Sequence, residues 1–112
     1  MPELTLYHNP RCSKSREALA LLESRGITVK IRRYLETPPT RDELAGLAVR
    51  LGDAYEQMLR HSDLRSREPA PTTREELVDL LATDPKLLQR PIADDGEYAV
   101  IGRPPQAILQ LI

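Results

Sequence analysis

The fold is decided by residues 4–26, which read LTLYHNPRCSKSREALALLESRG. Apolar and polar residues alternate at its start until Asn9-Pro10 breaks the run, which predicts a strand followed by a turn. From 13 to 25 the apolar residues recur at helical spacing, and Gly26 stands where a helix needs a left-handed terminating residue. This stretch therefore predicts a strand, a turn and a helix in succession.

A second strand is expected over residues 27–35, where Ile and Val alternate with polar residues before Pro38-Pro39. Two parallel strands joined by a helix should be connected in the right-handed sense. A helical insertion follows, because four helix starts are marked by a capping residue or a proline in the first turn. These starts are Thr40, Asp53, Thr73 and Pro85.

The C-terminal part predicts an antiparallel pair of strands. Arg90-Pro91-Ile92 begins a short strand, Asp95-Gly96 is a hairpin-turn signal, and residues 98–101 return. Apolar residues at 107–112 then form a last helical face. We predict one α/β domain over residues 1–112, ordered β-α-β, helical insertion and β-β-α, with a mixed four-stranded sheet.

Composition narrows the class of protein further. The 112 residues carry a formal net charge of −1, so no general attraction to nucleic acid or membrane is expected. The chain includes neither Phe nor Trp, so its core should be aliphatic. A single cysteine and two distant histidines give no disulfide and no zinc-ligand spacing. The five glycines form no phosphate-binding loop, and the paired acidic residues are explained by helix starts and a hairpin turn. We expect a cytoplasmic protein without bound metal or cofactor.

Cys12 is the leading candidate for chemistry. It opens the first predicted helix, so its sulfur should lie near unpaired backbone N–H groups at the positive end of the helix dipole. Arg11, Lys14 and Arg16 flank it, and cationic neighbours at a helix start lower the pKa of a thiol. The alternative is a small buried hydrophobe, but a core cysteine would sit among aliphatic residues. We predict a catalytic thiolate.

Other polar residues near Cys12 are candidates for supporting this thiolate. Asn9 and Ser15 are expected to support the thiolate, with Ser15 as a possible hydrogen-bond donor to the sulfur. His8, at the end of the first strand, could stabilise the thiolate or relay a proton, or could simply be a half-buried polar residue. His61 is interpreted as an exposed loop residue.

Arginine is the side chain best suited to a tetrahedral oxyanion, because its planar fork donates two hydrogen bonds and stays charged. Arg90 and Arg103 each stand beside a proline at the boundary of a predicted strand. Ligands commonly bind at strand ends in α/β sheets, which favours these two arginines over the remainder.

Taken together, five segments resemble the glutaredoxin-linked arsenate reductase family, a branch of the thioredoxin-like fold. They are spread in the same order through nearly the whole chain. The segments are 7–16, 34–44, Leu59-Arg60, Arg90-Pro91-Ile92 and Gly102-Arg103-Pro104.

The resemblance implies roles for individual residues. Cys12 would be the nucleophile that attacks the arsenic of arsenate, His8 would modulate the thiolate, and Arg60, Arg90 and Arg103 would bind the oxyanion. The Arg90-Pro91 peptide bond would be cis. Because the chain has no second cysteine, the reducing thiol must come from outside, and the family uses glutathione and glutaredoxin as partners.

Two alternatives remain open at this stage. One is a glutathione-linked thiol-disulfide oxidoreductase with another substrate, because the better-known arsenate reductases continue beyond the position of Ile112. The other is a non-enzymatic interaction module related to redox-sensing transcription regulators. Those regulators carry a Cys-x-x-Cys pair, whereas this chain has Ser15 at the second position.

Overall fold

The computed structural model describes residues 4–60 and 71–112 of the chain. Its centre is a four-stranded sheet in the order β2-β1-β3-β4. The strands are β1 (Leu4–Tyr7), β2 (Val29–Arg32), β3 (Ile92–Asp94) and β4 (Ala99–Ile101). β1 pairs in parallel with β2 and antiparallel with β3, and β3 pairs antiparallel with β4. The predicted mixed sheet is therefore confirmed.

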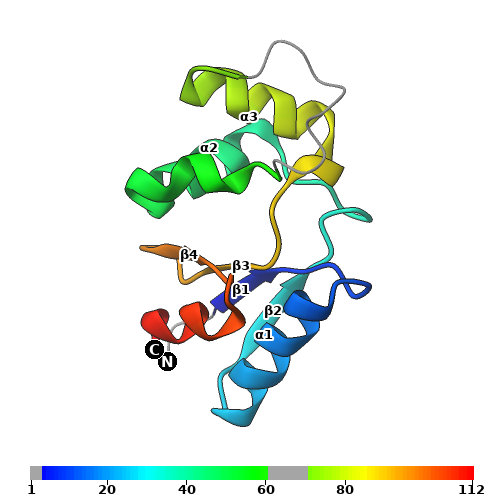
Figure 1. The fold of residues 1–112 in the computed structure, drawn as a ribbon, viewed down its shortest axis with the longest axis vertical. Helices are drawn as coiled ribbons and strands as arrows, with labels where there is room; N and C mark the ends of the chain where they lie inside the picture. Colours follow the sequence, from blue (N-terminus) through cyan, green and yellow to red (C-terminus); the bar gives the residue numbers. More distant parts are fainter. Residues whose placement is uncertain (1–3, 61–70) are drawn as a thin grey trace.

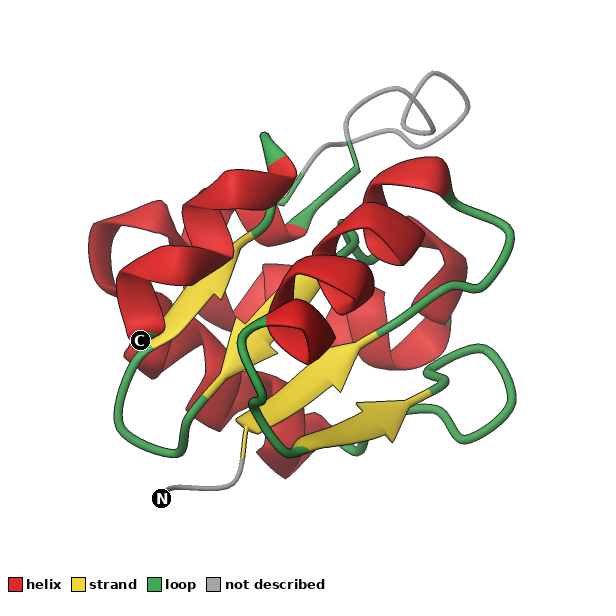
Figure 2. Ribbon diagram, turned by 90° about the horizontal axis from the view of Figure 1, so that it is seen from below, coloured by secondary structure: helices red, strands yellow, loops and turns green. Residues whose placement is uncertain are grey.

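Helices cover both faces of this sheet (Figures 1 and 2). α1 (Ser13–Ser24) and the 3-10 helix η4 (Pro105–Leu111) pack on one face, and α2 (Arg41–Leu51) and α3 (Arg74–Thr83) form a layer over the other. Successive residues of a strand point to opposite faces. Accordingly, Leu6 is buried against the α1 side and Tyr7 against the α2 side.

The helix boundaries follow the capping signals. α1 begins after Cys12, and Gly26 at φ 72° closes its C-terminal turn. At the start of α2, Thr40 and Glu43 form a reciprocal capping box, and Thr73 caps α3 by accepting a hydrogen bond from the Glu76 N–H. These caps satisfy N–H groups that the first turn of a helix leaves unpaired.

The short helical segments differ from the prediction. Residues Gly52–Met58 (η1) and Pro105–Leu111 (η4) are 3-10 helices, as is η3 (Pro85–Leu87), and Asp53 makes no cap because Leu51 is the N-cap of η1. In η4 the tighter pattern is visible where the Ala107 N–H donates to the Pro104 carbonyl oxygen three residues earlier. Apolar spacing over so few residues does not distinguish a 3-10 helix from an α-helix.

The second strand is shorter than expected and ends at Arg32 rather than near Leu35. Residues 33–37 turn away from the sheet, because the N–H groups of Glu36 and Thr37 both donate to the Arg33 carbonyl oxygen at 3.0 and 2.9 Å. This turn leads into α2 and carries one wall of the site described below.

An acidic residue assigned to the hairpin turn has an additional role. Asp94 is 7% exposed and accepts hydrogen bonds from Arg50 Nε and Nη2 at 2.8 and 2.7 Å, which ties β3 to α2. Asp95 does shape the hairpin, since its Oδ1 accepts from the N–H groups of Glu97 and Tyr98. Asp94 also takes part in the predicted turn, since its Oδ1 accepts from the Gly96 N–H at 2.9 Å.

The polar segment 60–71, which contains two prolines and lacks a clear period, is predicted to be an irregular loop. Its residues 61–70, His61 among them, lie outside the described residues. Within residues 4–60 and 71–112, no helix has both the length and the apolar character needed to cross a bilayer.

Candidate active site

Cys12 is the N-cap residue of α1 and has an extended backbone, with φ −93° and ψ 123°. Its N–H donates to the Asn9 carbonyl oxygen at 3.0 Å, which closes the turn after β1. The side chain is half-buried. The sulfur therefore lies at a helix start, where the first N–H groups have no partner within the helix.

Asn9 and Ser15, the two predicted supports, hold the turn that carries the sulfur. The Asn9 N–H donates to Ser15 Oγ at 3.1 Å, and the Arg11 N–H donates to Asn9 Oδ1 at 3.0 Å. Ser15 is fully buried, and its contact with Asn9 is partly buried. Ser15 Oγ acts as an acceptor in this contact, and the predicted hydrogen bond from its hydroxyl to the sulfur stays a prediction.

The environment of Cys12 lowers the pKa of its thiol. Burial alone raises the pKa, but the backbone N–H groups of Ser15 and Lys14, a hydrogen bond from the Arg90 side chain and the charge of Arg103 outweigh it. The same groups that stabilise a thiolate make a better nucleophile near neutral pH. The thiolate predicted at Cys12 is consistent with this setting.

Arg103 and Arg90 reach Cys12 from the C-terminal part of the sheet. Arg103 Nη2 lies 3.6 Å from Cys12 Sγ, and Arg103 Nε donates to the Arg90 carbonyl oxygen at 2.9 Å. Arg90 Nε is buried without a hydrogen-bond partner among the described residues. The Arg90-Pro91 peptide bond is cis, as the resemblance implied, and so is Arg103-Pro104.

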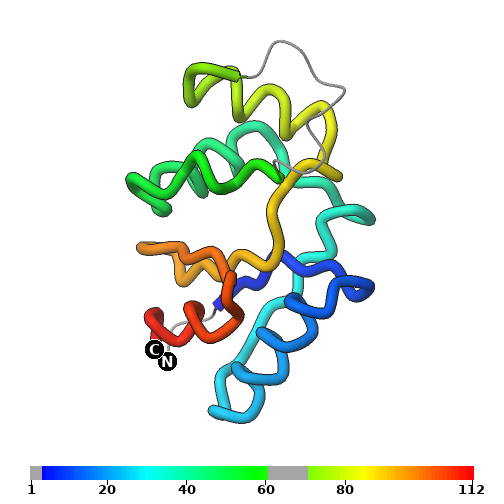
Figure 3. Tube along the Cα trace, in the orientation of Figure 1, coloured from blue at the N-terminus to red at the C-terminus, as the bar shows by residue number. Residues whose placement is uncertain are grey.

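Arg60 is brought to Arg90 by a backbone contact between two segments of the helical layer. Leu59 forms an isolated antiparallel bridge with Leu88, and the Arg60 N–H donates to the Leu87 carbonyl oxygen at 2.7 Å. The chain then runs from η3 down to β3 in one crossing, which Figure 3 shows as the segment leading from yellow to orange. Arg60 and Arg90 consequently line the same pocket.

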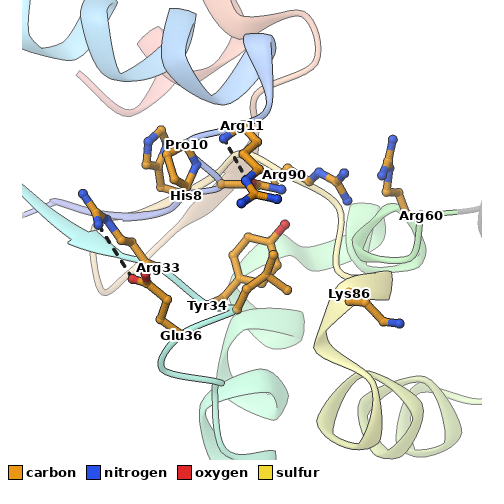
Figure 4. Close-up of a pocket in the computed structure, with 11 residues that line it drawn as sticks. His8, Pro10, Arg11, Arg33, Tyr34, Glu36, Arg60, Lys86 and Arg90 are labelled. Atoms are coloured by element: carbon orange, nitrogen blue, oxygen red, sulfur yellow. Dashed lines mark hydrogen bonds and ion pairs between the residues drawn. The ribbon is translucent and has the colours of Figure 1, made fainter.

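This pocket has a volume of about 450 Å³ and lies beside the turn that precedes Cys12 (Figure 4). The structure thus brings together His8, Asn9, Arg60 and Arg90 in its wall, while Arg103 contacts the sulfur. The other lining residues are Pro10, Arg11, Arg33, Tyr34, Leu35, Glu36 and Lys86. Five of the lining side chains are basic and one is acidic, so the pocket favours an anion.

His8 is buried at the end of β1, and its Nδ1 has no hydrogen-bond partner among the described residues. Burial, followed by the positive charges of Arg33 and Arg16, lowers the pKa of His8. The ring is therefore neutral near pH 7. Any support that it gives to the thiolate would come from a neutral imidazole and not from an imidazolium charge.

No cluster of three or more His, Cys, Asp or Glu side chains suited to a metal ion occurs in the part of the chain that is described. The chemistry available to the site is that of a thiol beside guanidinium groups. Such a site can form a covalent bond to an electrophilic centre and stabilise negative charge on its oxygens.

Tyr34 is a pocket residue to which sequence analysis assigned no role. Its signal in the sequence is weak, because it is one of four tyrosines and no local pattern shows that its ring is buried. The unpaired helix N–H groups that the sequence places near the sulfur are those of Lys14 and Ser15, and both lower the pKa of Cys12.

The chain is similar to known proteins over nearly its whole length. The model of the ArsC family matches residues 7–111. An arsenate reductase of Neisseria meningitidis is 42% identical over 109 residues, covering 93% of each chain. An arsenate reductase of Escherichia coli K12 is 34% identical, covering all of this chain and 82% of the other. The solved structure of an arsenate reductase from Vibrio cholerae has a TM-score of 0.86 and 38% identity, covering 99% of this chain and 98% of that one.

Proposed function

This chain belongs to the ArsC family and has its thioredoxin-like fold, and from that premise we propose that it reduces arsenate to arsenite with an external thiol as reductant. The observation that carries the proposal is the position of Cys12: its sulfur lies 3.6 Å from Arg103 Nη2, at a helix start next to an arginine-lined pocket. A tetrahedral oxyanion fits both the charge and the geometry of this arrangement.

In the first step the Cys12 thiolate attacks the arsenic atom. A sulfur–arsenic bond forms, and one arsenate oxygen leaves as water after taking up protons from solvent. Both reactants are anions, so their approach is unfavourable unless positive charge is placed between and around them. Arg60, Arg90 and Arg103 supply that charge, and their forks are matched to pairs of arsenate oxygens.

The reduction itself needs two electrons, which two thiol groups provide by joining as a disulfide. Cys12 is one of these groups, and the other must be external because the chain has no second cysteine. We propose glutathione as the attacking thiol, which would release arsenite and leave a mixed disulfide on Cys12. Glutaredoxin would then return Cys12 to the thiol, so the enzyme needs no bound cofactor.

A coupled assay tests this proposal. Arsenate-dependent oxidation of NADPH is followed in the presence of glutathione, glutaredoxin and glutathione reductase. The Cys12→Ser variant, checked for an intact fold by circular dichroism, provides the baseline. Activity well above that baseline is expected for the wild type. If well-folded wild-type protein does no better than Cys12→Ser, the proposed activity is wrong.

The choice of reductant is tested separately by exchanging the thiol system. Replacing glutathione and glutaredoxin with thioredoxin and thioredoxin reductase should reduce the rate to near the Cys12→Ser baseline. Equal rates with thioredoxin would leave arsenate reduction intact and refute the specific role of glutathione. Activity with a glutathione mixed disulfide but none with arsenate would instead favour a thiol-disulfide oxidoreductase.

A further inference from the structure

Tyr34 combines a core position with a polar group at the pocket. Its side chain is 0% exposed, and its ring belongs to the core cluster formed with Leu44 and Leu47 of α2. The residue also lines the pocket beside Arg60 and Arg90. In Figure 4 the ring rises from the core side, and its hydroxyl points towards the part of the pocket where these two arginines lie.

The Tyr34 hydroxyl has no hydrogen-bond partner among the described residues. Buried polar groups in folded proteins are nearly always paired, because a group that gives up water without a new partner destabilises the fold. The Asn9 side chain lies near enough to influence the hydroxyl, but not in hydrogen-bonding geometry. Phenylalanine would fill the same core space without this cost, so the hydroxyl needs another explanation.

The turn that carries Tyr34 is held firmly. Arg32 Nε donates to the Thr37 carbonyl oxygen at 2.8 Å, and its Nη2 donates to the Pro38 carbonyl oxygen at 3.0 Å. The same guanidinium makes two hydrogen bonds to the Glu43 carboxylate at 2.8 and 3.0 Å. These contacts hold the turn that carries the Tyr34 backbone in a fixed position.

Tyr34 remains a hydrogen-bond donor at neutral pH. Burial raises the pKa of its hydroxyl, and although the charge of Arg90 opposes this rise, the pKa stays above its ordinary value. A neutral O–H next to two guanidinium groups can donate to an anion's oxygen without adding or removing charge.

We propose that Tyr34 is a substrate-binding residue. Its hydroxyl donates a hydrogen bond to one oxygen of the tetrahedral oxyanion held by Arg60 and Arg90. This inference rests on the proposed function, because the oxyanion is the substrate of that reaction. The substrate completes a hydrogen bond that the protein leaves open. The unpaired hydroxyl destabilises the anion-free protein, so the hydrogen bond that it forms to a bound anion strengthens anion binding.

The variant Tyr34→Phe removes only the hydroxyl, and Tyr7→Phe is its matched control. Tyr7 belongs to the same core cluster but does not line the pocket. In the arsenate assay, Tyr34→Phe should lower kcat/KM by about 10- to 100-fold, as expected for a hydrogen bond to a charged group. Most of this loss should appear as a higher KM, and Tyr7→Phe should stay close to wild type.

Two measurements of thermal stability make the test independent of turnover. Without an anion, Tyr34→Phe should melt at the same temperature as wild type or higher, because an unsatisfied polar group has been removed. With sulfate, and with arsenate in a Cys12→Ser background, the anion-induced rise in melting temperature should be smaller for Tyr34→Phe than for Tyr7→Phe.

The outcomes separate this inference from the proposed function. If wild type reduces arsenate and Tyr34→Phe has the same kcat/KM, the role of Tyr34 is refuted while the function stands. If wild type does not reduce arsenate, the proposed function is wrong. The anion-induced rise in melting temperature of Tyr34→Phe, compared with that of Tyr7→Phe, then tests the role of Tyr34 in anion binding. A less stable anion-free Tyr34→Phe with an undiminished response to sulfate would show a structural hydroxyl and overturn the inference.

Discussion

Replacing Glu43 with glutamine tests the clamp that holds the turn of residues 33–37. The Glu43 carboxylate accepts two hydrogen bonds from Arg32, at 2.8 and 3.0 Å. Its Oε1 also accepts from the Thr40 N–H in the capping box of α2. Glutamine can keep the capping bond, since it is accepted at this helix position, but it removes the charge that Arg32 faces. The substitution thus isolates the ion pair.

The size of the effect follows from the pKa of Glu43. The hydrogen bond from Arg32, with further help from Thr40, lowers this pKa from 4.5 to about 2. A fall of about 2.5, at about 1.36 kcal/mol for each pKa unit, sets an upper limit of about 3.4 kcal/mol on the stabilisation. The Glu43 side chain is 37% exposed, so solvent screening reduces the expected loss in Glu43→Gln to about 1–2 kcal/mol.

The pH dependence has a definite sign. Because the pKa of Glu43 is lower in the folded protein than in the unfolded chain, its stabilisation is fully present above about pH 4.5. It is lost as the pH falls through the window from about 4.5 to about 2. Wild type and Glu43→Gln should therefore differ most near neutral pH and converge in acid.

Urea unfolding followed by circular dichroism measures this difference at pH 7 and at several values down to about pH 3. Glu17→Gln is the matched control, because Glu17 faces Lys14 at 4.0 Å with 55% of its side chain exposed. The control should lose less than about 0.5 kcal/mol, as exposed pairs do. The reasoning is refuted if Glu43→Gln loses no more than the control, or if its deficit does not change with pH.

Two further substitutions test the C-terminal side of the site. Arg103→Gln should raise the pKa of the Cys12 thiol, so the midpoint of iodoacetamide alkylation against pH should move upwards; an unchanged midpoint would contradict the role of the 3.6 Å contact. In Gly102→Ala the new Cβ would lie 2.8 Å from Pro91 Cγ and 3.0 Å from Ile108 Cγ2. Overpacking of this kind costs about 1–3 kcal/mol in urea unfolding, whereas wild-type stability would show that these two neighbours move aside easily.

Much of the fold could be predicted because its signals are local. The alternation before Asn9-Pro10, the capping pair Thr40 and Glu43, and Gly26 after the first helix each act within a few residues. The same is true of the Asp95-Gly96 hairpin. The type of the short helices and the early end of β2 were not predictable, because they depend on turns and packing that the pattern of apolar residues does not encode.

In the site, too, some residues have a local signal in the sequence and others depend on packing. Cys12 could be proposed as a candidate from its neighbours in sequence, whereas Arg60 carried no local signal. It reaches the pocket because Leu59 pairs with Leu88, a contact between segments far apart in the chain. The unpaired state of the Tyr34 hydroxyl is likewise a property of the packed protein, since it depends on every neighbour around the ring.

The contact between Arg103 and Cys12 also bears on the order in which the protein becomes active. The two residues are 91 positions apart, and Arg90 acts on the same sulfur from the preceding strand boundary. During synthesis the N-terminal strand, helix and strand emerge long before either arginine. At that stage Cys12 has only helix N–H groups to lower its pKa. The environment that lowers the pKa of Cys12 is therefore completed last, so an incomplete chain carries a less acidic thiol than the complete protein.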